Sequence, residues 1–192
     1  MKVNIVLGTL IFAAGVLTIA AGAFAAGSAD SASPAAENKP LEVVPYVDLQ
    51  KYLGTWYEIA TIPMSFQKGC VGVTAEYVLR PDGDITVINT CRQGTLDGKV
   101  RTAHGKAWVV DKKTNAKLKV RFFWPFTGAY WVIGLDADYQ WAIVGHPGRN
   151  YLWILSRAPQ MDDALYNELL KLIADKGYDL AKIKRTLQPG GN

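Results

Sequence analysis

The chain has 192 residues, with 21 Lys and Arg against 17 Asp and Glu and a formal net charge of +4 at pH 7. This length fits one domain with its own core plus a leader. The basic residues are spread along the chain with acids between them, which argues against a protein that binds nucleic acid or an anionic membrane and favours a solvated surface. Six Trp and nine Tyr either fill a core or form the aromatic wall of a pocket.

Residues 1–25 predict a secretory signal peptide. Lys2 precedes an apolar run, and small residues around Phe24 supply a cleavage position, so we expect cleavage near Ala25. The alternative is an uncleaved membrane anchor, because the run approaches the roughly 20 residues that span a bilayer. Residues 26–46 are rich in Ser, Ala and Pro and predict a flexible N-terminal segment.

The two cysteines, Cys70 and Cys91, predict a disulfide, because export places them in an oxidising compartment. The separation in sequence between the cysteines and His104 or His146 does not match the spacing of metal ligands. The sequence also does not place a base beside either thiol, as a catalytic cysteine needs. No cysteine precedes Cys70, which argues against a bacterial lipobox. Hairpin pairing places Cys70 opposite a residue near position 94, so either a bulge or a Cys70 just outside the strand is needed to bring the cysteines together.

From about residue 50 the chain predicts eight short strands, separated by turn residues. Apolar and polar residues alternate over most of them, as in a half-buried sheet. Short connections between consecutive strands favour an antiparallel up-and-down order, which closes into a barrel; a sandwich would use the same number of strands. The expected strands are 53–62, 71–80, 84–91, 104–111, 116–123, 129–136, 139–145 and 151–157.

One helix is predicted after the strands, over residues 162–176. Asp162 and Asp163 suit its N-terminus and Gly177 suits the position after its end. Its exposed face carries both charge signs, so we expect it to pack on the barrel rather than on a membrane. Its apolar stripe consists of Leu165, Leu169, Leu172 and Ile173.

Three segments resemble the motifs of the lipocalin family. The stretch from Tyr52 to Ala60 is similar to the Gly-x-Trp signature, Asp138-Tyr139 to the second motif, and Leu155-Ser156-Arg157 to the third. The likeness runs from about residue 47 to 189 and extends to bacterial outer-membrane lipocalins related to apolipoprotein D. It implies an all-β fold: an eight-stranded antiparallel up-and-down β-barrel with one C-terminal α-helix packed outside, followed by a tail at 190–192.

The resemblance also implies a structural signature at the closed end of the barrel. Gly54 permits a tight turn into the first strand, and Trp56 is a large plug. The family likeness favours the guanidinium of Arg157 stacked over Trp56, whereas the alternative is a surface salt bridge. We assign these residues no catalytic role.

Inward-facing residues define the candidate cavity wall. Their apolar area favours a hydrophobic ligand, and their hydroxyl and indole groups are suited to fixing a head group; core packing is the alternative for each aromatic. Alternation places Trp141 and Trp153 on one face with Tyr139. The candidates are Val73, Tyr77, Leu118, Val120, Phe122, Tyr139, Trp141 and Trp153.

The resemblance implies a non-enzymatic protein that binds, stores or transports a small hydrophobic ligand in the bacterial cell envelope, most simply a fatty acid or lysophospholipid. We expect an exported, periplasmic or envelope location without cofactor, metal or nucleic acid. Outer-membrane association, peripheral membrane contact and a homodimer are left open. The alternatives are a lipocalin-fold enzyme that uses His104, Cys70 or Cys91, and an envelope protein-interaction module.

Overall fold

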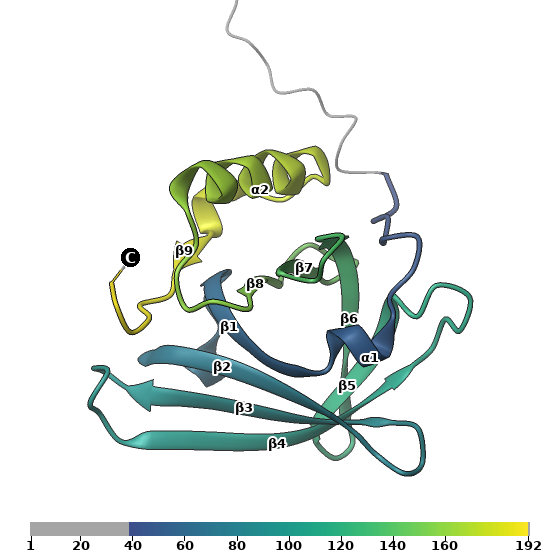
Figure 1. Ribbon diagram of the computed structural model, residues 1–192, viewed down its shortest axis with the longest axis horizontal. Coiled ribbons are helices and arrows are strands. Elements are labelled where there is room, and N and C mark those ends of the chain that lie inside the picture. Colours follow the sequence, from purple (N-terminus) through teal and green to yellow (C-terminus); the bar gives the residue numbers. More distant parts are fainter. Residues whose placement is uncertain (1–38, 192) are drawn as a thin grey trace, which may run out of the picture. The chain divides into compact units, whose positions relative to one another are not determined.

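The computed structural model describes residues 39–191; the predicted signal peptide lies outside the described residues. Eight strands form a closed antiparallel barrel in which each strand pairs with the next, and β1 pairs with both β8 and β2 (Figure 1). The predicted up-and-down barrel is therefore confirmed. The strands are β1 (Gly54–Thr61), β2 (Cys70–Leu79), β3 (Ile85–Gln93), β4 (Val100–Val109), β5 (Lys117–Phe123), β6 (Phe126–Leu135), β7 (Trp141–Gly145) and β8 (Leu152–Ser156).

The strand order gives the barrel two distinct ends. The short helix α1 (Leu49–Tyr52) and the turns after β2, β4 and β6 lie at one end, which we call the closed end. The connections after β1, β3, β5 and β7 lie at the other end, which we call the mouth. The mouth therefore consists of residues 62–69, 94–99, 124–125 and 146–151, and 62–69 includes a 3₁₀ turn at Ser65–Gln67.

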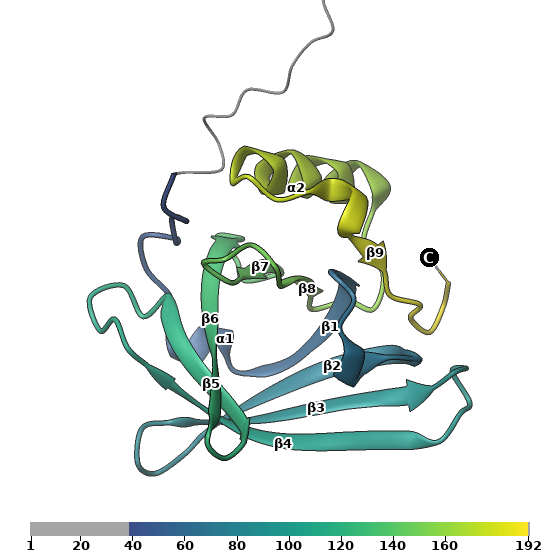
Figure 2. The ribbon, with the colours of Figure 1, turned by 180° about the vertical axis from the view of Figure 1, so that it is seen from behind.

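Two apolar clusters lie on opposite sides of the barrel wall. Val144 and Trp153 pair across β7 and β8 and belong to the interior cluster, whereas their neighbours Ile143 and Ile154 face outward. The outward residues pack against Leu169 of helix α2 (Asp163–Asp175), which lies along the outside of the barrel as predicted (Figure 2). Among residues 39–191, no helix is long and apolar enough to cross a membrane.

The C-terminal segment fills a gap in the barrel wall. Beyond the pairing of Tyr57 with Thr74, β1 separates from β2 and pairs instead with the short strand β9 (Lys184–Arg185), which follows a 3₁₀ turn at Leu180–Lys182. On the other side of the gap, the Gly72 amide donates a hydrogen bond to the Leu187 carbonyl at 2.7 Å. Residues 184–188 therefore form the seam between β1 and β2, a feature that the sequence analysis did not predict.

The packed structure also begins earlier than expected. Leu41 is buried in the cluster beneath α2, and the Val44 amide donates to the Val132 carbonyl at 3.0 Å. Residues 41–44 thus lie against the barrel, although the sequence analysis assigned them to a flexible segment and placed the start of the domain at Val47.

The disulfide between Cys70 and Cys91 is present, with 5.4 Å between their Cα atoms. The β2–β3 pairing shifts by one residue between Val71 and Thr74, where Gly72 has φ +57°. This bulge puts Cys70 opposite Gln93 and within bonding reach of Cys91. Of the two expected solutions, the structure has the bulge, and Cys70 is the first residue of β2.

Candidate functional site

Arg157 seals the closed end of the barrel. Its guanidinium carbon lies 3.8 Å from the centre of the Trp56 ring, which confirms the predicted stacking. The Trp56 indole donates to the Tyr52 carbonyl at 2.8 Å, and a Cβ on Gly54, which has φ +87°, would lie 3.6 Å from the guanidinium. Partial burial lowers the pKa of Arg157. Its guanidinium donates to the carbonyls of Lys51, Leu53, Thr55 and Tyr139.

Three tyrosines form the floor of the barrel interior. The Tyr130 hydroxyl lies 2.8 Å from the hydroxyls of both Tyr52 and Tyr77. Burial raises the pKa of all three groups, that of Tyr77 to about 12, so they are neutral at physiological pH. Two hydrogen bonds engage two of the three hydroxyl protons, which leaves one proton to donate to a water or a ligand.

Little space remains around this floor. The cavity beside the tyrosines has a volume of about 10 Å³, which is at the lower limit for one water molecule. The deep interior is therefore packed core, too small for an acyl chain. Its lining residues are Val47, Leu49, Tyr52, Tyr77, Ile85, Val87, Ala107, Leu118, Tyr130 and Val132.

Nearer the mouth the interior wall is less completely covered. Val120 and Phe122 near the end of β5 and Trp153 near the start of β8 are half-buried against the interior cluster. The Phe122 ring occupies the place that a side chain at Gly105 would take, because a Cβ there would lie 2.8 Å from the ring. These residues form an upper apolar wall above the packed floor.

The structure divides the predicted cavity-wall residues between several places. Val120, Phe122 and Trp153 form the upper wall, whereas Tyr77 and Leu118 line the packed floor. Val73 is buried beside the β2 bulge but belongs to neither cluster.

The placement of Trp141 was wrong, for a backbone reason. Tyr139 has φ +59° and lies in the turn before β7, so alternation counted from it does not continue into the strand. Trp141 consequently packs in the cluster beneath α2, on the opposite side of the wall from Trp153. Tyr139 lies at the closed end, where its hydroxyl accepts a hydrogen bond from the Asp48 amide at 2.8 Å.

A second, larger hollow lies at the mouth. A pocket of about 530 Å³ is bounded by the end of β1, the connection 62–69, the start of β2 and residues 184–187. Glu58 and Thr61 line it and pair with Leu155 and Trp153 of the interior cluster, which places their side chains on the inner face of β1. Lys68 and Lys184 line the same pocket, so its border carries positive charge.

Glu58 is the buried charged group of this pocket. Its carboxylate accepts hydrogen bonds from the Thr186 hydroxyl and from the Gln67 amide, the latter at 2.6 Å. Burial raises the pKa of Glu58, and these two hydrogen bonds partly offset that effect. The Gln188 amide nitrogen donates to the carbonyls of Glu58 and Val73, each at 2.8 Å. Sequence reasoning missed this group, although a carboxylate within the Gly-x-Trp stretch was a signal for it.

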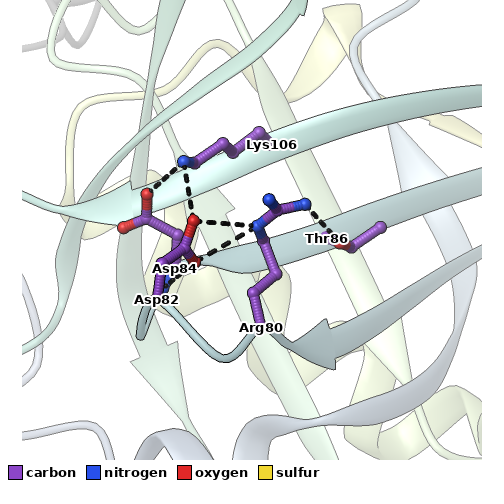
Figure 3. Close-up of polar contacts among 5 residues, drawn as sticks. All are labelled: Arg80, Asp82, Asp84, Thr86 and Lys106. Atoms are coloured by element: carbon purple, nitrogen blue, oxygen red, sulfur yellow. Dashed lines mark hydrogen bonds and ion pairs between the residues drawn. The ribbon is translucent and has the colours of Figure 1, made fainter.

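Four charged side chains at the closed end are paired with one another (Figure 3). Lys106 on β4 lies 2.6 Å from Asp84 and 3.3 Å from Asp82, and Arg80 contacts Asp82 at 3.2 Å. Hydrogen bonds to the two carboxylates raise the pKa of Lys106. The cluster fastens the β2–β3 turn to β4. Within residues 39–191, no three His, Cys, Asp or Glu side chains are grouped as a metal site needs.

A family model described as a Lipocalin-like domain matches residues 47–188. The chain belongs to the lipocalin family. Temperature-induced lipocalin-1 of Arabidopsis thaliana is 43% identical over 79% of the chain and 85% of its own length. Outer membrane lipoprotein Blc of Escherichia coli K12 is 41% identical over 91% and 98%. Apolipoprotein D of Bos taurus is 34% identical over 73% and 77%, so the predicted branch is confirmed.

A solved lipocalin barrel shares the fold. The structure of insecticyanin from the tobacco hornworm Manduca sexta superposes with a TM-score of 0.62 at 19% identity, covering 77% of this chain and 84% of that one. The family and the barrel together support binding of a small hydrophobic ligand by this lipocalin.

Proposed function

We propose that this lipocalin binds one single-chain lipid, a fatty acid or a lysophospholipid, and stores or carries it in the bacterial cell envelope. The observation that carries the proposal is the change in packing along the interior. The floor is filled down to about 10 Å³, whereas the mouth opens into a pocket of about 530 Å³. A ligand therefore occupies the half of the barrel nearer the mouth.

The two parts of the lipid match two parts of this site. The acyl chain lies along Val120, Phe122 and Trp153, where each buried methylene contributes about 0.8 kcal/mol. The carboxylate or phosphate lies in the mouth pocket near Lys68 and Lys184. An eight-stranded barrel has room for one small ligand, which favours one acyl chain over two.

The envelope location rests on separate observations. The relatives named Blc are outer membrane lipoproteins, and the Cys70–Cys91 disulfide suits an oxidising compartment. Both cysteines of the sequence are used in that bond, which supports a carrier that is not held by a lipid-modified cysteine and argues against a thiol enzyme.

A titration with fatty acids and lysophospholipids of increasing chain length tests the proposal. Affinity should rise about fourfold per methylene and level off when the upper site is full. Trp153→Phe should reduce the fluorescence change on binding, whereas the matched variant Trp141→Phe, on the outer face, should leave it intact. Mass spectrometry of a solvent extract identifies the native ligand. Affinity that is flat with chain length, or lipid that emerges hydrolysed, contradicts a carrier.

A further inference from the structure

The β5–β6 hairpin exposes large aromatic side chains at the mouth. Phe123, Trp124 and Phe126 are 75%, 81% and 77% exposed, although each side chain is strongly apolar. The hairpin lies on the side of the barrel away from α2 (Figures 1 and 2), so the helix does not cover it. Phe66, in another connection of the mouth, is 67% exposed. The three exposed aromatics of the hairpin lie within four residues of one another, and such a grouping marks an interaction surface.

Positive charge is concentrated in the same part of the chain. Residues 99–135 contain eight of the 21 Lys and Arg but one of the 17 Asp and Glu, so this stretch carries more positive charge than the whole chain does. The even spread inferred from the sequence therefore does not hold in the region around the hairpin. β4, β5 and β6 contain no acidic residue.

The fold aligns part of this charge with the aromatic tip. Leu118 and Val120 of β5 face the interior, so Lys117, Lys119 and Arg121 lie on its outer face and lead to the hairpin. Within residues 39–191, none of these three forms an ion pair with a carboxylate. The cations near the β2–β3 turn differ, because Arg80 and Lys106 are held by Asp82 and Asp84 (Figure 3).

We propose that this surface docks on a lipid bilayer that contains anionic lipid. Phe123, Trp124 and Phe126 insert among the acyl chains and head groups, where aromatic side chains are favoured. Arg121 and Lys119, the outer-face cations of β5 nearest the tip, lie over the anionic head groups, where one cation contributes about fivefold to binding. Lys117 and Arg121 each lie over a Trp ring, but an apolar protein partner would offer no opposite charge to any of the three cations. The docking does not depend on which ligand the barrel holds; if the proposed lipid function is correct, docking also brings the mouth next to the source of the lipid.

Flotation with vesicles tests the docking. The protein is purified after export, so that any leader removed in the cell is absent. It should float with vesicles of phosphatidylethanolamine and phosphatidylglycerol (3:1) and at least tenfold less with phosphatidylcholine alone. Combined Phe123→Ser, Trp124→Ser and Phe126→Ser substitutions should reduce binding to background, whereas Tyr46→Ser, at an exposed aromatic of the closed end, should not. Lys119→Gln should weaken binding about fivefold and Lys171→Gln, on α2, should not change it.

Insertion has a direct spectroscopic readout. Lipids brominated on their acyl chains should quench the fluorescence of Trp124, and the Trp124→Phe variant should lose that quenching. A triple variant that unfolds at the wild-type temperature yet still binds vesicles as strongly overturns the proposal. The proposal is also overturned if the wild-type protein does not bind vesicles but forms a dimer, measured by light scattering, that the triple variant does not form. The hairpin would then be a contact between two copies of the chain.

The same variants separate this inference from the proposed function. Lysophospholipid supplied below its critical micelle concentration should bind the triple variant as it binds the wild type. Vesicle binding without lysophospholipid binding overturns the carrier function and leaves the docking intact. Lysophospholipid binding without vesicle docking overturns the docking and leaves the carrier function intact.

Discussion

Replacing Arg157 by alanine should destabilise the barrel by about 2–4 kcal/mol while ligand binding is retained. The substitution removes a cation–π contact at 3.8 Å, which contributes about 0.5–2 kcal/mol. It also removes charge-assisted hydrogen bonds to four backbone carbonyls. Such bonds contribute about 1.5–3 kcal/mol each when buried, but several of these carbonyls are near solvent and regain water, so the sum is far smaller.

Urea unfolding followed by Trp fluorescence measures the change in unfolding free energy. For a domain of this size the loss corresponds to a fall in Tm of about 4–16 °C. Arg157→Lys is the control. It keeps the charge but loses the planar group that stacks on Trp56 and reaches several carbonyls, so its unfolding free energy should be only slightly higher than that of Arg157→Ala. Unchanged stability combined with lost lipid binding would refute the structural role, because Arg157 would then contact the ligand.

Three further changes have defined outcomes. Tyr130→Phe should cost about 1–3 kcal/mol in urea unfolding, because it leaves two buried hydroxyls without their shared partner. Reduction of the Cys70–Cys91 disulfide should cost about 3 kcal/mol, measured by calorimetry with and without reductant, since the bond closes a loop of 21 residues. Because the folded-state pKa of Glu58 is raised, the wild type should lose stability as pH rises from about 4.5 through that pKa; Glu58→Gln should remove this slope, and an unchanged slope would show that another group titrates.

The parts of the fold that were predictable are those in which local pattern and burial agree. In β5, Leu118 and Val120 alternate with lysines, and the interior cluster contains both apolar residues. Arg157 and Trp56 were paired through the family likeness, and their contact is confirmed.

The errors arise where the backbone departs from regular alternation or where distant segments meet. Trp141 was predicted on the wrong side of the wall because strict alternation does not allow for the positive φ of Tyr139. A two-residue strand such as β9 has too few residues to show a pattern. Two of the partners of Glu58, Thr186 and Gln188, lie about 130 residues away in the chain, so no local signal reveals them. The exposure of the hairpin aromatics likewise depends on the β5–β6 turn in three dimensions and not on composition.

The seam between β1 and β2 has a consequence for biogenesis. Its filling segment, residues 184–188, follows every barrel strand in the chain, and Gln188 within it is fully buried. The barrel wall therefore cannot be completed until all eight barrel strands and residues 184–188 have been synthesised. Synthesis that stops before Thr186 leaves the Glu58 carboxylate without its hydroxyl partner and the gap open. Residues 184–188 thus close the barrel wall only after all eight barrel strands have been made.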